Sequence, residues 1–417
     1  MRNALRIVLW GVCGLVVLSG VAHAEVQAGA AYEPFLLPKH VPLAGYSRRG
    51  GKPSQGVHDP VGVRAIVLSD ATTTVALISC DLLIIDEHLF GEVERQLRSA
   101  GWPPSLQVML AATHTHSGPG AYGPKFLEKL SMGHYDSQVC AAIAQAIVRA
   151  VGRAAQARAP VAMKYGSMET EGLVRNRISE DGPVDAQVVV LGFYHPPARQ
   201  PFAIVVDFAA HPTTLGAWNR LLSADYPGVL VRELERRFPQ ATAVFLAGAV
   251  GDQGPVKSGN QFERAEWFGR ALADAASRFV EQADPMVPPE VRAVQERVVL
   301  PPAQVRLGHL MFPRWLGRSL VDDDATLSVI RVVTTAFLGA PCDLTAELGE
   351  RLKSTARSYG LNPVIVGFTN DYIGYCVSES LYRAHQYESS MAFNGPKAGE
   401  LIVDRLSRLL KDISHGT

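Results

Sequence analysis

The stretch LQVMLAATHTHSGPG, residues 106–120, joins an apolar run to a histidine pair and a glycine-rich turn. Its first seven residues are typical of a short buried strand. The glycines and proline of residues 118–120 predict a tight loop directly behind that strand. Because alternate residues of a strand share a face, His114 and His116 are expected to point the same way. The pair is therefore a candidate for half of a metal site.

Apolar runs of the same kind alternate with helical periodicity along the rest of the chain. Strands are predicted at residues 64–70, 74–83, 203–210, 243–248 and 363–368, and helices at residues 85–100, 137–156, 226–238, 261–282 and 345–359. Alternation on this scale predicts an α/β protein with mixed β-sheets flanked by helices. The proline-rich segment 284–290 leads into a run at 291–300 that alternates like an edge strand. Residues 25–417 are therefore expected to form one large domain.

The amino terminus has the layout of a secretory signal. Two arginines at positions 2 and 6 precede an apolar run over residues 7–21 and the small-residue segment Ala22-His23-Ala24. A membrane anchor is the alternative, but the apolar run is shorter than the roughly 20 residues that a span needs. We therefore expect residues 1–24 to be removed, and the mature chain to be soluble and either secreted or periplasmic.

The charge balance indicates no polyanionic partner. Lysines and arginines number 40 and aspartates and glutamates also number 40, so the net charge gives no sign of nucleic-acid binding. The expected ligand is a small molecule or a lipid, and no transmembrane span is expected in the mature chain. Oligomeric state is not readable from the sequence.

Polar or glycine-rich segments follow the predicted strands, and α/β proteins place their sites at such strand ends. His211-Pro212 follows one strand, the loop 247–255 follows the next, and the segments 341–345 and 369–375 follow two more. A single histidine at a strand end is more often an ordinary loop residue than a ligand, whereas the paired histidines are a stronger signal. Neither a His-Glu-x-x-His helix nor a Gly-x-Ser-x-Gly elbow is present, which argues against the common metalloprotease and serine-hydrolase layouts.

The order of these segments resembles the catalytic domain of the neutral ceramidases, zinc-dependent amidases that split ceramide into sphingosine and a fatty acid. The family's Thr-His-Thr-His-Ser-Gly-Pro-Gly stretch matches residues 113–120 in full. Further matching blocks occur in the same order between roughly residues 40 and 400: Leu43–Tyr46 with Arg64-Ala65, Asn176-Arg177, His211–Thr213 with Ser223–Gly228, Pro341–Thr345, and Asn370–Tyr375 with Tyr387-Glu388 and Gly395-Pro396.

The resemblance implies a Zn²⁺ ion bound by His114, His211, Asp343 and Tyr375. This set suits the metal, because zinc accepts imidazole nitrogen and carboxylate oxygen and keeps a position open for water in catalytic sites. Water activated in this way attacks an amide carbonyl that the metal also polarises. Asp343 stands where the family has glutamate, and carboxylates of either length bind zinc.

The resemblance also implies catalytic residues around the metal. His116 is expected to shuttle a proton or to orient the nucleophile. Asn176 and Arg177 are expected to hold a polar headgroup or the developing oxyanion. Asp252, in the glycine-rich loop 247–255, is the remaining catalytic candidate.

One departure from the family leaves the substrate open. Gly254 stands where ceramidases have a catalytic serine, so no hydroxyl is available there, and Ser117 is expected to face away from the metal. From the 417 residues, the carboxy-terminal β-domain that ceramidases carry is also expected to be missing. The leading hypothesis is an exported, zinc-dependent amidase that cleaves the N-acyl bond of ceramide or a related lipid. The alternatives are a zinc hydrolase for another N-acyl or ester substrate, and a non-catalytic exported binding protein.

The cysteines allow two interpretations. Four of them follow the predicted signal: Cys80, Cys140, Cys342 and Cys376. Cys342 and Cys376 adjoin two implied ligands, so they are expected to lie close together. A disulfide between them in an oxidising compartment and a pair of buried thiols remain equal alternatives.

Overall fold

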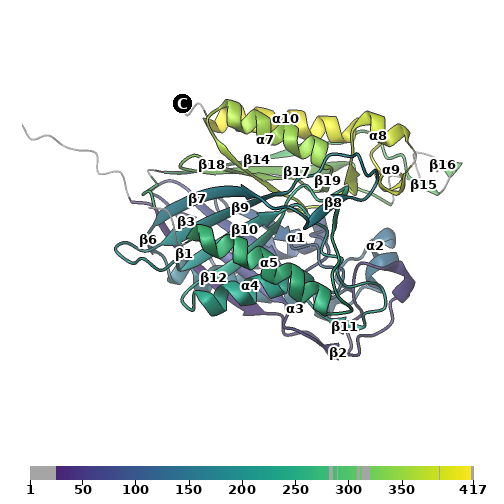
Figure 1. The fold of residues 1–417 in the computed structure, drawn as a ribbon, viewed down its shortest axis with the longest axis horizontal. Coiled ribbons are helices and arrows are strands. Elements are labelled where there is room, and N and C mark those ends of the chain that lie inside the picture. Colours follow the sequence, from purple (N-terminus) through teal and green to yellow (C-terminus); the bar gives the residue numbers. More distant parts are fainter. Residues whose placement is uncertain are drawn as a thin grey trace, which may run out of the picture.

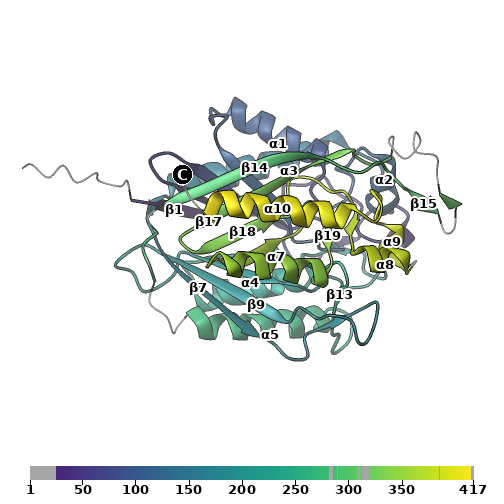
Figure 2. The same cartoon turned by 90° about the horizontal axis from the view of Figure 1, so that it is seen from above.

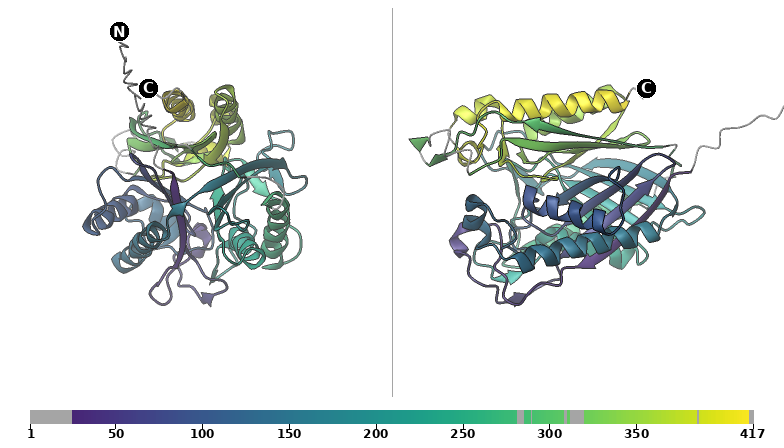
Figure 3. Two further views of the ribbon diagram at one scale, coloured as in Figure 1. Left: turned by 90° about the vertical axis from the view of Figure 1, so that its left-hand side faces the viewer. Right: turned by 180° about the vertical axis from the view of Figure 1, so that it is seen from behind.

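Three β-sheets arranged around a shared centre form the framework of the protein, with helices on their outer faces (Figures 1 and 3). The structure is a computed structural model that describes residues 25–280, 285–288, 290–307, 310–311, 320–384 and 386–414. The predicted signal segment, residues 1–24, lies outside the described residues, as do Asp284 and Pro289 of the proline-rich connection.

The first sheet is formed by the amino-terminal third of the chain. Its order is β5 (Gln107–Ala112), β4 (Thr74–Cys80), β3 (Gly62–Ser69), β1 (Gln27–Pro34) and β6 (Ala159–Pro160). The pair β4–β5 is parallel, and the other pairs are antiparallel. Helices α1 (Glu87–Ser99) and α3 (Ser137–Gln156) cover this sheet.

The second sheet has the order β12 (Thr242–Ala247), β10 (Ala203–Phe208), β9 (Gln187–Tyr194) and β7 (Ala162–Glu169), with α4 (Asp225–Arg237) and α5 (Glu263–Val280) against it. The third has the order β14 (Val291–Val299), β17 (Asp324–Val332), β18 (Thr335–Gly339) and β20 (Asn362–Val366), covered by α7 (Ala346–Ser358) and α10 (Ala398–Ser414). Each of these sheets contains one parallel pair, β10–β12 and β18–β20.

Short elements complete the chain at the ends of the sheets. They are η1 (Ser47–Arg49), α2 (Phe126–Met132), α8 (Glu379–Arg383), α9 (Tyr387–Ser390), β2 (Gly56–Val57), β8 (Val174–Asn176), β11 (Leu221–Leu222), β13 (Gln253–Pro255), β15 (Arg306–Leu307), β16 (Leu310–Met311), β19 (Asp343–Leu344) and β21 (Tyr375–Cys376). Helices α2, α8 and α9 lie at the same end of the molecule in both perpendicular views (Figures 1 and 2). Among the helices that the structure describes, none combines the length and apolarity of a membrane span.

The central core explains why the strands correspond to continuous apolar runs in the sequence. On β3, Val63, Ala65 and Val67 pack toward the covering helices, whereas Ile66 and Leu68 face the centre. The central cluster joins the inner faces of all three sheets. Because both faces of the central strands are buried, most of their positions are apolar, and polar exceptions such as Arg64, Ser79 and Asp207 are themselves buried. The predicted α/β class with mixed, helix-covered sheets is confirmed, and β14 is an edge strand as predicted.

Candidate functional site

The carboxyl ends of strands from all three sheets meet at one end of the molecule. Strand β5 leads to His114, β10 leads to His211, and β18 leads to Asp343. Backbone hydrogen bonds join neighbouring sheets here, as from Gly367 N–H to the Ala247 oxygen at 2.8 Å. Segments far apart in the sequence are therefore held at fixed distances from one another.

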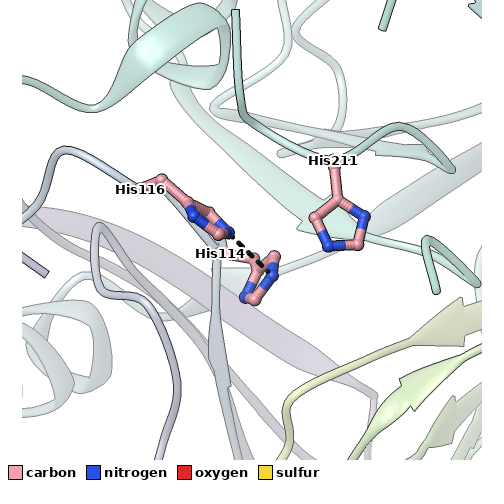
Figure 4. Close-up of side chains that lie close together, drawn as sticks. All are labelled: His114, His116 and His211. Atoms are coloured by element: carbon pink, nitrogen blue, oxygen red, sulfur yellow. Dashed lines mark hydrogen bonds between the residues drawn. The ribbon is translucent and has the colours of Figure 1, made fainter. Parts of the chain in front are cut away.

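The histidine pair lies beyond its strand rather than on it. Strand β5 ends at Ala112, and His114 has a left-handed backbone with a φ of 62°. The prediction that strand alternation aligns the two side chains is therefore wrong in its reason, although the rings do converge. The two Nε2 atoms are 3.2 Å apart, with the rings nearly perpendicular (Figure 4). Phe368 stacks on His114 with ring centroids 3.9 Å apart and helps to fix this strained turn.

Backbone carbonyls fix the tautomers of two of the histidines. The Nδ1 atoms of His114 and His211 lie 2.7 Å from the carbonyl oxygens of Leu83 and Val250, respectively. A carbonyl oxygen only accepts, so each Nδ1 carries the proton and each Nε2 keeps a lone pair. Burial lowers the pKa of His114 to about 3 and the pKa of His211 well below its usual value. Both rings are therefore neutral, which is the form that binds metals.

Asp343 brings a third acceptor to the same point. Its Oδ1 lies 3.6 Å from His114 Nε2 and 3.2 Å from His211 Nε2. It is fully buried, and nothing in the described part of the chain donates a hydrogen bond to Oδ1. Two lone pairs and a carboxylate oxygen at this distance repel one another unless a proton or a cation lies between them. Burial raises the pKa of Asp343, and the neighbouring His114 opposes that rise.

The donor set fits a metal ion. Nitrogen atoms of His114, His116 and His211 all lie within 4.8 Å of one another. The Tyr375 hydroxyl is 3.4 Å from His211 Nε2. Imidazole nitrogen combined with a carboxylate is a common ligand set for zinc. The structure thus brings together the four implied ligands, and it places His116 Nε2 3.2 Å from His114 Nε2.

Arg177 holds the tyrosine of this cluster. Its Nη2 donates to the Tyr375 hydroxyl at 2.7 Å and to the Gly251 carbonyl at 2.8 Å, while its Nε is 3.0 Å from Glu388. Burial raises the pKa of Tyr375 well above its usual value, and the guanidinium opposes that rise. A cationic donor to the phenol oxygen favours the phenolate, which is the form that binds a metal ion.

The side chains of Asn176 and Asp252 form hydrogen bonds with other groups of the protein. Asn176 donates to Asp252 Oδ2 and to a backbone carbonyl, both at 2.9 Å, and its own oxygen accepts two backbone N–H groups. Asp252 Oδ1 also accepts from the Ala346 N–H, at the start of α7, at 2.8 Å. These bonds fill the hydrogen-bonding capacity of Asn176, which favours a role in positioning the adjacent Arg177. Direct contact of either side chain with substrate stays a prediction.

A cavity of about 120 Å³ opens beside the cluster. Most of its walls are apolar, and Lys125, Glu128 and Asp322 line it in addition to the histidines and tyrosines of the cluster. It is lined by Gly45, Leu83, Ile84, His114, His116, Lys125, Leu127, Glu128, Ser131, Leu320, Val321, Asp322, Tyr372, Tyr375, Tyr387, Met391 and Phe393. Apolar walls with a few convergent polar groups are the usual features of a ligand site.

Sequence reasoning missed three residues that support the cluster. Arg49 is buried and donates to the backbone oxygens of His116 and Ala44, both at 2.6 Å. Tyr372 donates to the second oxygen of Asp343 at 2.7 Å, and Glu388 pairs with Arg177. Tyr372 and Glu388 lie in blocks that carried the family resemblance. In contrast, nothing in the sequence distinguishes Arg49 from its exposed neighbour Arg48.

The cysteines near the site are free thiols. Cys342 precedes β19 and Cys376 ends β21, and these two strands pair in parallel. All four cysteines that the structure describes are buried and unbridged. Their predicted proximity is confirmed, and the structure corresponds to the second alternative, a pair of buried thiols.

We predict that Gly45→Ala lowers turnover by about 10- to 100-fold, because it displaces His116 from the cluster. Gly45 has a φ of 105°, and a methyl group there would lie 2.6 Å from His116 Cβ. Gly50→Ala is the matched control, since Gly50 also has a positive φ, of 59°, with no atom within 4 Å of the added carbon. Steady-state kinetics of both variants test this. Equal losses in both would show that backbone strain, rather than displacement of His116, is responsible.

A buried cluster of histidines and a carboxylate, at the strand ends of a helix-covered α/β framework, forms a candidate metal centre. Residues 38–261, more than half of the chain, match the family model described as neutral/alkaline non-lysosomal ceramidase, N-terminal. The neutral ceramidase of Pseudomonas aeruginosa is 25% identical, over 90% of this chain and 69% of its own length. The neutral ceramidase of Drosophila melanogaster is 20% identical, over 96% of this chain and 75% of its own.

Solved structures agree with the sequence comparisons. The crystal structure of the Pseudomonas aeruginosa neutral ceramidase matches with a TM-score of 0.84 and 23% identity, covering 94% of this chain and 75% of that one. A structure described as ceramidase complexed with C2 matches with a TM-score of 0.85 and 21% identity, covering 94% and 76%. The chain belongs to the neutral/alkaline non-lysosomal ceramidase family, and it is a hydrolase by that membership.

Proposed function

We propose that the protein is an exported, zinc-dependent amidase that hydrolyses the N-acyl bond of ceramide or a related lipid. The observation that carries this proposal is the meeting of His114 Nε2, His211 Nε2 and Asp343 Oδ1 with no donor among the described residues for that oxygen. A cation is the simplest partner for three converging acceptors. Family membership and the apolar cavity beside the cluster support an acylated substrate.

The proposed ligands are His114, His211, Asp343 and Tyr375. When bound, zinc would supply a Lewis acid that polarises the scissile carbonyl and makes water a nucleophile at neutral pH. The protein holds its ligands in the required state by neutralising both imidazoles and by placing Arg177 on Tyr375. The Tyr372 hydroxyl orients the carboxylate of Asp343 through its other oxygen.

His116 is the proposed proton shuttle. Its Nε2 faces the cluster, and its Nδ1 has no hydrogen-bond partner in the described structure. The ring also lines the cavity, within reach of a bound substrate. A neutral imidazole here takes a proton from the attacking water and returns it to the leaving amine. Arg49 donates to the backbone oxygen of His116, which helps to keep the imidazole ring oriented toward the cluster.

Gly254 determines which nucleophile is available. A side chain would fit at this position, because an added Cβ would lie 3.5 Å from Arg177 Cβ and 3.9 Å from the Arg175 oxygen. Both are ordinary contacts, so the glycine is not required by packing. Ser117 offers no substitute, because its buried hydroxyl accepts a hydrogen bond from Asn219 at 3.0 Å. Water is therefore the proposed nucleophile.

Gly254→Ser is expected to change turnover of an N-acyl substrate less than about tenfold, or under about 1.4 kcal/mol of barrier. Water does the attack in both proteins, and Gly254→Ala controls for the added carbon. Purified wild type and both variants should be assayed on ceramide, on shorter N-acyl compounds and on esters. A wild type inactive on every compound, together with an active Gly254→Ser, would support the non-catalytic alternative instead.

The same substrate panel tests the second candidate, a zinc hydrolase for another N-acyl or ester substrate. The observation that favours it is the group of ionisable side chains on the cavity wall, Lys125, Glu128 and Asp322. Lys125 forms an ion pair with Asp322, and burial raises the pKa of Glu128 to about 8, so this wall is polar with its charges paired within the protein. Such a wall suits a substrate that is polar at some distance from the scissile bond. Cleavage of a polar N-acyl compound with ceramide untouched would select this candidate and keep the mechanism.

Export is proposed from the amino-terminal sequence alone. The basic start, the short apolar run and Ala22-His23-Ala24 predict a mature chain that begins at Glu25. Amino-terminal sequencing of the exported protein tests it, and an intact Met1 would contradict it.

A further inference from the structure

Helix α2 presents large apolar side chains to solvent beside the cavity. Phe126 is 60% exposed and Leu130 is 53% exposed. They are four positions apart, so they share one side of the helix. Leu127 and Ser131, on the same helix, line the cavity. One short helix thus forms both a wall of the candidate active site and an exposed apolar surface, and such surfaces often mark interaction sites.

The exposed charges next to this surface are basic. Arg48 and Lys52, in and after η1, are exposed, as is Lys129 on α2. This loop packs against α2, since the Gly45 N–H donates to the Ser131 oxygen at 2.9 Å. The single carboxylate of α2, on Glu128, is half-buried and accepts from the Lys125 N–H. A second carboxylate beside α2, on Asp322, is paired with Lys125. Arg48, Lys52 and Lys129 therefore leave this edge with an excess of positive charge, although the chain as a whole has no net charge.

Tyr387 adds a further exposed aromatic side chain beside the cavity. Its side chain is 61% exposed, and it also lines the cavity. Helix α9, which carries it, lies at the same end of the molecule as α2 (Figures 1 and 2). An aromatic residue with a polar tip is typical of the boundary between acyl chains and water.

We propose that Phe126, Leu130 and Tyr387, with Arg48, Lys52 and Lys129, form a docking surface for a lipid bilayer that carries anionic headgroups. The apolar side chains would enter the acyl region while the basic ones meet the phosphates, the pattern of proteins that bind at a membrane interface. The choice of a lipid surface rests on the proposed function, because an N-acyl lipid resides in a bilayer. Docking at this surface would place the cavity next to the bilayer in which the lipid substrate resides.

Vesicle co-sedimentation of the full chain tests the docking surface. The probes are vesicles of phosphatidylcholine alone and of phosphatidylcholine with phosphatidylglycerol. Phe126→Ala/Leu130→Ala is expected to weaken binding to the anionic vesicles by about tenfold or more, with alanine preserving the helix. Arg48→Gln/Lys129→Gln and raised salt are also expected to weaken it.

Val287→Ala is the matched control, expected to bind as the wild type does. Val287 is 57% exposed, and its neighbour Met286 bridges to Met163 at the start of β7, away from the strand ends that carry the site. Turnover of a soluble short-chain substrate should be unchanged in the α2 variant. Vesicle binding needs no turnover, so it separates failure of this inference from failure of the proposed amidase. A wild type that ignores anionic vesicles, binds neutral ones equally well, or binds no better than the α2 variant would overturn the inference.

Discussion

His211→Ala is expected to abolish hydrolysis while leaving the chain folded. The substitution removes one of the three acceptors that meet at the cluster, and Asp343 and His114 alone leave the site half-formed. It also leaves the Val250 carbonyl without its imidazole donor, at a cost to stability of about 1–3 kcal/mol. Steady-state turnover and thermal unfolding, measured on the same preparation, test both parts.

His195→Ala is the matched control for that experiment. His195 also places its Nδ1 near a backbone oxygen, that of Pro160 at 3.0 Å, but it follows β9 in a different part of the second sheet. We expect it to lose stability without losing turnover. Retention of more than about a tenth of wild-type turnover in His211→Ala, a barrier change under about 1.4 kcal/mol, would remove His211 from the essential set.

His116→Ala is expected to lower turnover by about 10²- to 10⁴-fold, the usual contribution of a general acid–base. Metal content should be retained, because the four proposed ligands are intact. The proximity of its Nε2 to that of His114, 3.2 Å, makes the metal measurement decisive for the role of this residue. Loss of the metal in His116→Ala would assign it as a ligand and would leave the proton shuttle unassigned.

Ser117→Ala accompanies His116→Ala as the neighbouring control. Its hydroxyl is held by Asn219, so we expect a modest loss of stability, about 1 kcal/mol, and little change in chemistry. Abolished turnover with normal folding and metal content would refute water as the nucleophile.

Many of the helices and strands can be predicted from the local pattern of apolar and polar residues in the sequence. The helix predicted at residues 137–156 is α3, with the same bounds, because an aspartate caps its start and an apolar stripe continues to its end. The strands predicted around residues 64–70 and 203–210 are β3 and β10, within two residues at each end. The arrangement of three sheets about one core was not predictable, because it depends on contacts between segments far apart in sequence.

The site, like the fold, can be predicted only in part from the sequence. The spacing of His114 and His116 indicates a site, whereas only the family resemblance indicates Asp343 and Tyr375, because single polar residues at strand ends are common. The left-handed turn at His114 is fixed by tertiary packing against Phe368. Arg49 illustrates the limit of local reasoning, because it lies 67 positions from the histidine whose backbone it holds.

The most direct test of the central claim, a catalytic metal held by residues that follow strands of all three sheets, is elemental analysis of purified protein. The samples are the wild type, His116→Ala, His211→Ala and Asp343→Ala, each reconstituted with zinc and freed of excess metal. We predict about one zinc per chain in the wild type and in His116→Ala, and almost none in the other two variants, from the ligand number of a zinc site. A metal-free wild type, or full zinc occupancy in His211→Ala, would contradict the account.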